Sequence, residues 1–150
     1  MTAYQTVVVG TDGSDSSYLA VDKAAKIAAD SGATLVVACA YHPARPNDVN
    51  RAADQLGDDV AYQVVGSTPA EDTVRTAAER ARKQGAAKID TVVVDGEPVP
   101  TLIKVVEERD ADLLVVGNRG LNTLAGRILG SVPAEAARKS KVDVLIVHTT

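Results

Sequence analysis

The sequence predicts an α/β fold with a Rossmann-like, open parallel sheet of five strands and helices on both faces. Five short apolar runs rich in valine alternate with segments of helical periodicity. The chain has 150 residues, which suits one domain over residues 1–150. It has four Tyr and no Phe or Trp, so the core must consist of Val, Ala, Leu and Ile. That composition is typical of helices packed on a buried parallel sheet.

The expected strands are five apolar runs, none of which alternates strictly between apolar and polar residues. Continuous runs of this length are typical of strands that are buried on both faces. The five runs are Thr6–Gly10, Thr34–Tyr41, Thr91–Val94, Leu113–Val116 and Val144–Val147.

The first two helices have recognisable start and stop signals. Ser14 is a suitable N-cap for the first helix, and Gly32 is a suitable residue to end it. The second helix opens with the capping box Thr68-Pro69-Ala70-Glu71, which places proline at the first helical position, and it ends at Gly85. Both helices therefore have boundaries that the sequence predicts.

Two further helices complete the alternation. The third is expected to start near Pro100, and the fourth runs from Ser131 to about Lys139 with Pro133 in its first turn. Strands and helices that alternate in this way favour a parallel sheet. Residues 42–66 are polar and interrupt the pattern, so we expect a long surface segment there.

The charge and the single cysteine restrict the partners and the compartment. The net charge is -4 and the sequence pI is about 5.1, so the chain lacks the basic surface that nucleic acid requires. Cys39 is the only cysteine, which fits a reducing compartment. The start of the chain does not resemble a signal peptide, and no apolar run approaches the roughly 20 residues needed to cross a bilayer. We expect a cytoplasmic protein that binds no membrane.

The turn after the first strand is the first candidate for chemistry. It reads Gly10-Thr11-Asp12-Gly13-Ser14. Glycines permit a tight turn and close approach of a ligand to the backbone. In an open parallel sheet, ligands bind beyond the carboxyl ends of the strands. Asp12 is placed to accept hydrogen bonds from a ribose hydroxyl or to hold a metal, and Thr11 belongs to the same candidate site.

The loop after the fourth strand is a stronger candidate. Residues 117–131 place Gly117, Gly120, Gly130 and Ser131 in the pattern G-x2-G-x9-G-S. Ser131 opens the fourth helix, where free backbone N–H groups and the helix dipole favour an anion. Arg119 and Arg127 are available cations in the same loop. The pattern therefore predicts a phosphate-binding site.

Other residue patterns argue against competing chemistries. The chain has neither G-x-x-x-x-G-K-[ST] nor G-x-G-x-x-G, which argues against a P-loop enzyme and a dinucleotide oxidoreductase. His42 and His148 have no partners at ligand spacing, and we expect both at the surface. Cys39 is expected to be a buried apolar residue of the second strand. We identify no catalytic set and no metal-ligand set.

The glycine spacing resembles the nucleotide-binding motif of ATP-binding universal stress proteins. The likeness covers nearly the whole chain. Segment Val7–Ser14 is similar to their first strand and its turn, Asp110–Gly117 to their fourth strand, and Asp143–Val147 to their last. The resemblance implies a sheet of order 3-2-1-4-5 and a homodimer.

The resemblance also implies a role for each site residue. Asp12 would meet the ribose, and Pro133 departs from the Ser or Ala of many members, which removes one N–H donor to a phosphate. The adenine pocket would be lined by Gly10, Ala40 and Val116, and the phosphates and ribose would be surrounded by Gly117, Arg119, Gly120, Gly130, Ser131 and Val132.

The predicted function is adenine-nucleotide binding by a sensor, sink or regulator in stress or second-messenger signalling. The ligand is cyclic AMP, AMP or ATP, the last with Mg²⁺. We expect the dimer to form through strand five, because Val144, Leu145, Ile146 and Val147 make an apolar edge that invites pairing. Two alternatives stay open: an ATP-hydrolysing or ATP-pyrophosphatase-like enzyme of the same fold, and an interaction module that binds no nucleotide.

Overall fold

A single five-stranded parallel sheet organises the chain in the computed structural model. The structure describes residues 3–42, 67–118 and 131–149. The strands lie in the order β3-β2-β1-β4-β5, and every pair of neighbours is parallel. The fold class expected from the sequence and the strand order implied by the family resemblance are therefore confirmed. In chain order, the elements are β1 (Thr6–Gly10), α1 (Asp15–Ser31), β2 (Thr34–Tyr41), α3 (Ser67–Lys83), β3 (Lys88–Asp95), α4 (Pro98–Glu108), β4 (Leu113–Gly117), α5 (Ser131–Lys139) and β5 (Asp143–Val147).

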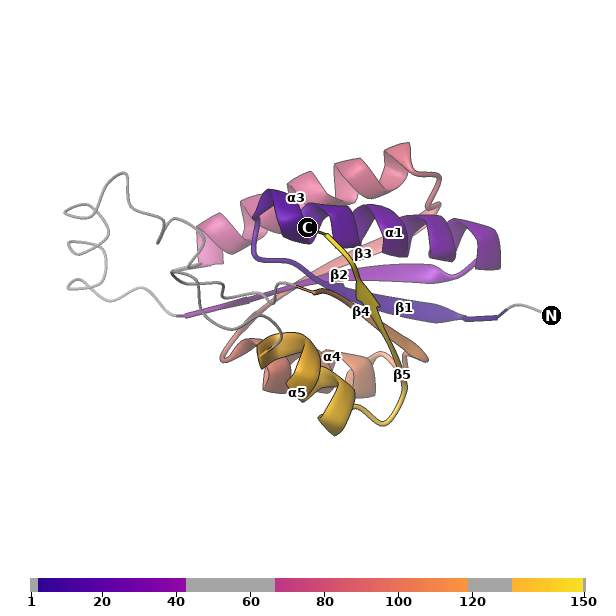
Figure 1. The fold of residues 1–150 in the computed structure, drawn as a ribbon. Helices are drawn as coiled ribbons and strands as arrows, with labels where there is room; N and C mark the ends of the chain where they lie inside the picture. Colours follow the sequence, from indigo (N-terminus) through magenta and orange to yellow (C-terminus); the bar gives the residue numbers. More distant parts are fainter. Residues whose placement is uncertain (1–2, 43–66, 119–130, 150) are drawn as a thin grey trace.

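Two apolar layers hold the helices to the sheet. Helices α1 and α3 cover one face, and α4 and α5 cover the other (Figure 1). Alternate residues of β1 show the division, because Val7 and Val9 face α1 and α3 whereas Val8 faces α4. All three valines are fully buried. Since a helix covers each face, the central strands need apolar residues at every position, as their continuous runs predict.

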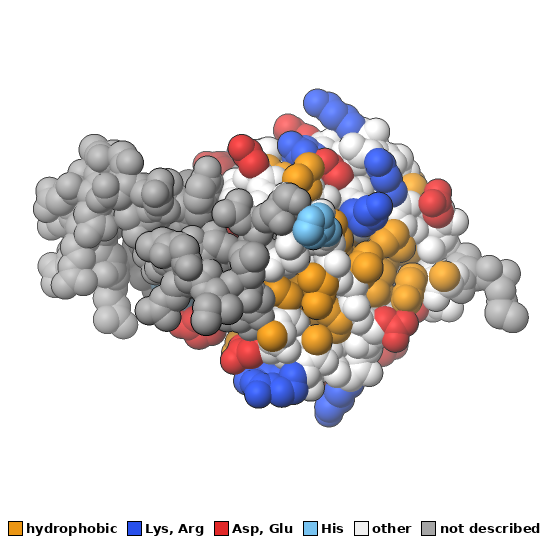
Figure 2. Space-filling view, in the orientation of Figure 1, with side chains coloured by type: hydrophobic (Ala, Val, Ile, Leu, Met, Phe, Trp, Pro, Cys, Tyr) orange, Lys and Arg blue, Asp and Glu red, His pale blue; other side chains and the backbone are white. Residues whose placement is uncertain are grey.

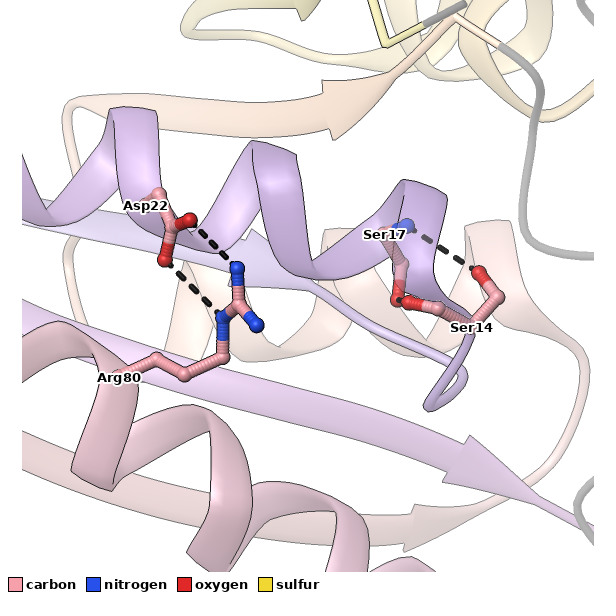
Figure 3. Close-up of polar contacts among 4 residues, drawn as sticks. All are labelled: Ser14, Ser17, Asp22 and Arg80. Carbon is pink, nitrogen blue, oxygen red and sulfur yellow. Dashed lines mark hydrogen bonds and ion pairs between the residues drawn. The ribbon is translucent and has the colours of Figure 1, made fainter.

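Helix α1 begins and ends where its sequence signals predict. The Ser14 hydroxyl accepts a hydrogen bond from the Ser17 N–H at 3.1 Å (Figure 3). Gly32 adopts φ 65° and ψ 27°, and its N–H bonds to the carbonyls of Ala28 and Ala29. Only glycine reaches this left-handed conformation without a steric cost from Cβ. The start and the end of α1 are thus fixed by local chemistry.

The predicted starts of two other helices were wrong by one or two residues. Helix α3 begins at Ser67, so Thr68 lies inside the helix rather than at its cap. Helix α4 begins at Pro98 instead of Pro100. None of the first four N–H groups of a helix has an acceptor within it, so proline is tolerated throughout the first turn and does not mark one position.

The outer strands differ from the prediction that all five strands are buried on both faces. Strand β3 starts at Lys88, three residues before the predicted Thr91, because it pairs with all eight residues of β2. Both β3 and β5 are edge strands and are partly exposed along their length. Residue 42 excepted, the predicted surface segment 42–66 lies outside the described residues. Within the described part of the chain, no helix is long and apolar enough to cross a membrane.

Candidate functional site

The candidate site lies where the direction of strand order reverses. From β1 the chain continues outward to β2 and β3 on one side, then returns to place β4 on the other side of β1. The connection after β1 therefore runs toward one edge of the sheet, and the connection after β4 runs toward the other. Ligands of open α/β sheets bind beyond the carboxyl ends of such strands. Both predicted motifs begin there, because Gly10 ends β1 and Gly117 ends β4.

The turn after β1 is held by a series of hydrogen bonds in which each donor can be assigned. The Thr11 N–H donates to the Ala38 carbonyl at 3.0 Å, which ties the turn to β2. The Ser17 hydroxyl donates to the Ser14 carbonyl, and it lies 2.7 Å from the Thr11 hydroxyl. Because the single Ser17 proton is already used, the Thr11 hydroxyl must be the donor to Ser17. The Gly13 N–H in turn donates to Thr11.

Asp12 is held inside this turn as a buried carboxyl group. It is 8% exposed, and its Oδ1 accepts a hydrogen bond from the Ser14 N–H at 3.0 Å. Burial raises the pKa of Asp12 above its usual value of 3.8, and hydrogen bonds from Ser14 oppose that rise. A buried carboxylate is shielded from water, so additional hydrogen-bond donors stabilise its charged form. The hydroxyls of a sugar are donors of that kind.

The predicted adenine-pocket residues lie on one face of the sheet together with Val132, which was predicted beside the phosphates and ribose. Gly10 follows Val8 by two residues, Ala40 follows the buried Ala38 by two, and alternation places both pairs on the face of α4 and α5. Val116 and Val132 belong to the apolar cluster on that same face and are nearly inaccessible, at 0% and 6% exposed. The structure therefore brings these four residues of three strands and one helix to a common side.

The predicted phosphate-binding residues are described only in part. Gly117 is buried at the end of β4. Ser131 is the first residue of α5, at a helix terminus that favours anions, and its side chain lies outside the described residues. Arg119, Gly120, Gly130 and Arg127 also lie outside them.

Other predicted roles concern residues near the site. His42 and His148 are exposed, as expected. Cys39 is buried in β2, and burial together with the nearby Asp12 charge raises the pKa of its thiol to about 12. A thiol with so high a pKa is unreactive at neutral pH. In the described ranges, no group of three or more His, Cys, Asp or Glu side chains gathers to hold a metal.

Three residues beside the site had no role in the sequence prediction. Ser17 is buried and anchors Thr11, whereas Asn118 and Thr149 bond to each other at the end of β4. Asn118 lies within the glycine motif, which is the only signal that singles it out. Thr149 has no such signal, because its partner is 31 residues away.

Comparison with known proteins identifies the family. The model of the universal stress protein family matches residues 3–148. This chain belongs to the universal stress protein family. The resemblance inferred from the glycine spacing is therefore confirmed across nearly the entire sequence.

Individual relatives are similar over their full length. Universal stress protein Rv1636 of Mycobacterium tuberculosis H37Rv is 53% identical over 150 residues, which is 100% of both chains. A solved universal stress protein in complex with cAMP is 50% identical, with a TM-score of 0.76 and coverage of 99% of this chain and 100% of that one. The Archaeoglobus fulgidus protein in complex with dAMP has a TM-score of 0.69, with 96% and 98% of the two chains covered. At 21% identity it shows the fold alone.

Proposed function

We propose that this universal stress protein binds an adenine nucleotide beyond the carboxyl ends of β1 and β4, and acts in the cytoplasm as a sensor, sink or regulator. The observation that carries the proposal is the relative that was solved with cAMP, which is 50% identical over 99% of this chain. The buried Asp12 and the start of α5 supply the polar groups that such a ligand needs at the edge of the sheet.

Each part of the nucleotide has a proposed partner. The Asp12 carboxylate accepts hydrogen bonds from the ribose. Because Asp12 is buried, few water molecules have to leave this carboxylate when the ribose binds. Gly10, Ala40 and Val116 form the apolar wall against adenine, and the phosphate lies at the N-terminus of α5. Gly117, Arg119, Gly120, Gly130, Ser131 and Val132 complete the phosphate and ribose contacts, and Thr11 positions the turn.

We propose that cyclic AMP binds at least as tightly as ATP. A cyclic phosphate is compact and carries the least charge of the candidate ligands. The glycine loop contains two arginines and no lysine, and the net charge of -4 gives no long-range attraction for a triphosphate. Pro133 also lacks the N–H that would serve a longer phosphate chain. Mg²⁺ would offset part of the ATP charge.

Calorimetric titration tests this preference. The purified protein is titrated with cyclic AMP, AMP, ATP and cyclic GMP, with and without Mg²⁺. We expect cyclic AMP to bind with equal or higher affinity than ATP. ATP affinity more than about tenfold higher, equivalent to about 1.4 kcal/mol, would overturn the preference. Release of phosphate or pyrophosphate during the ATP titration would favour the enzyme alternative, and no heat with any nucleotide would reject the function.

Two glycine substitutions test the site directly. Gly120→Val and Gly130→Val each add a branched side chain where we propose that the backbone approaches phosphate. We expect both variants to fold and to lose nucleotide binding. Ala137→Val is the matched control, because it places the same valine side chain at an exposed position of α5. Wild-type affinity in both glycine variants would contradict the proposed site.

We further propose a homodimer through β5. This edge strand pairs only with β4 among the described strands, and its Ile146 is 43% exposed. Figure 2 shows hydrophobic side chains gathered over β5 and α1. A two-fold pairing of Val144, Leu145, Ile146 and Val147 with their copies would cover this edge. Light scattering should give the mass of a dimer at micromolar concentration, and a monomer would reject the pairing.

A further inference from the structure

The end of β4 has an unusual hydrogen-bond pattern at Asn118. The β4–β5 register pairs Gly117 with Val147. If the parallel ladder continued, the residue after Gly117 would donate its N–H to the Val147 carbonyl, and its own carbonyl would accept from the Thr149 N–H. The Asn118 N–H does donate to the Val147 carbonyl, at 2.8 Å. The Thr149 N–H, however, donates to the Asn118 side-chain oxygen Oδ1, at 2.8 Å. Asn118 thus supplies a side-chain acceptor where a regular strand would supply its backbone carbonyl.

A hydroxyl chain holds that side-chain oxygen in place. The Thr149 hydroxyl donates to Asn118 Oδ1 at 2.9 Å, so this oxygen accepts two hydrogen bonds from one residue. The Ser16 hydroxyl lies 2.6 Å from the Thr149 hydroxyl. Since the Thr149 proton is committed to Asn118, Ser16 must be the donor to Thr149. The chain therefore links the first turn of α1 to the end of β4 through Thr149.

The position of this chain connects it to both predicted motifs. Ser16 follows the Gly10–Ser14 turn by two residues, and Asn118 follows Gly117 directly. A Cβ placed on Gly117 would lie 3.5 Å from Thr149 Cγ2, so Thr149 packs against the last residue of β4. All three hydrogen-bonding residues are half-buried, where such bonds are only partly replaced by water.

We propose that Thr149 is a positioning residue for the nucleotide site. Its hydroxyl and N–H hold the Asn118 side chain, and this fixes the point and direction in which the backbone leaves β4 toward residue 119. Because consecutive Cα atoms are 3.8 Å apart, a displaced Asn118 displaces the start of the glycine loop. The inference rests on the proposed nucleotide site, and it adds a residue outside the glycine motif to that site.

Substitutions that separate the hydroxyl from the shape of Thr149 test the proposal. Thr149→Val keeps the volume and removes the hydroxyl, whereas Thr149→Ser keeps the hydroxyl. Thr91→Val makes the same chemical change at an exposed position of β3, on the opposite edge of the sheet, and serves as the control. In calorimetric titration with cyclic AMP, we expect Thr149→Val to weaken binding about fivefold, the effect of roughly one net hydrogen bond. Thr149→Ser and Thr91→Val should keep wild-type affinity.

A second variant and a second measurement distinguish positioning from general stability. Ser16→Ala removes only the donor to Thr149, and it should weaken binding in the same direction by a smaller factor. Coupling between two sites is reciprocal. Saturating cyclic AMP should therefore slow hydrogen exchange of the Thr149 amide in the wild-type protein more than that of the Thr91 amide.

The outcomes separate this inference from the proposed function. If the wild-type protein does not bind cyclic AMP or any other adenine nucleotide, the proposed function fails, and the positioning role fails with it. If the wild-type protein binds and Thr149→Val binds within about twofold of it, the positioning role alone is overturned. Equal losses of affinity in Thr149→Val and Thr149→Ser would also overturn it, because the hydroxyl would then not be the group that acts.

Discussion

Gly13, in the turn that holds Asp12, offers a quantitative test of how this turn is built. Its φ is +87°, a conformation that side chains with a Cβ rarely adopt. A Cβ added here would also lie 3.0 Å from the Thr73 hydroxyl of α3. Gly13→Ala therefore combines two separate costs, backbone strain and a close contact between the turn and a neighbouring helix.

The expected loss of stability follows from these two costs. The positive φ costs an alanine about 1–2 kcal/mol, and the stiffer unfolded chain returns about 0.4–1 kcal/mol of that. Moving Thr73 away from the new Cβ adds about 0.5–1.5 kcal/mol, the cost of displacing a side chain from its rotamer. We therefore expect Gly13→Ala to lower the free energy of unfolding by about 2 kcal/mol. For a chain of this size the corresponding fall in Tm is about 4–8 °C.

Gly32 provides the matched control for this experiment. It also has a positive φ, at 65°, but a Cβ placed on it would meet no atom within 4 Å. Gly32→Ala should therefore cost about 1 kcal/mol from the backbone alone. Adding Thr73→Ala to Gly13→Ala should restore most of the difference between the two glycine variants.

Denaturant unfolding of the wild type and the three variants measures these differences, and cyclic AMP titration shows whether the turn is displaced. Gly13→Ala should weaken binding because it disturbs Asp12, whereas Gly32→Ala, at the far end of α1, should not. The reasoning is refuted if Gly13→Ala is as stable as the wild type, or if Thr73→Ala gives no recovery.

Three further predictions concern titration, an ion pair and a thiol. Burial raises the pKa of Asp12 in the folded protein above its usual value of 3.8. The free energy of unfolding of the wild type therefore falls as the pH rises from 3.8 through this raised pKa, because the unfolded state releases the Asp12 proton more readily. The stability of Asp12→Asn relative to wild type should therefore increase between pH 4 and pH 7 in denaturant unfolding, and a constant difference would contradict this. Arg80 of α3 makes a two-point ion pair with Asp22 of α1, at 2.6 and 3.1 Å (Figure 3). Because Arg80 is 38% exposed, a double-mutant cycle with Arg80→Met and Asp22→Asn should give a coupling of only about 1 kcal/mol. Cys39 should react with a thiol reagent only as fast as the protein unfolds, and rapid labelling of the native protein would contradict this expectation.

The sequence alone was sufficient for most of the fold. Continuous valine-rich runs identify strands β1, β2 and β4, because a strand covered on both faces needs apolar residues at every position. The caps Ser14 and Gly32 act within a few residues of themselves, so local reasoning located both ends of α1. Edge strands were less predictable, since polar residues such as Lys88 are tolerated where one side of the strand faces water.

The candidate site, like the fold, was predictable from the sequence only in part. The spacing of the glycines and the turn with Asp12 were visible in the sequence, because each motif is contiguous in the chain. The burial that raises the Asp12 pKa depends on how β1 and α1 pack against neighbouring elements, and no local pattern encodes it.

The chain from Ser16 through Thr149 to Asn118 was decided by the tertiary structure alone. Ser16 and Thr149 are 133 residues apart, and they meet only because β4 lies between β1 and β5 in the sheet. A threonine or a serine forms hydrogen bonds with whatever the fold places beside it, so its identity does not reveal its partner. Local periodicity and capping specify the elements, whereas contacts between distant residues exist only after those elements have packed.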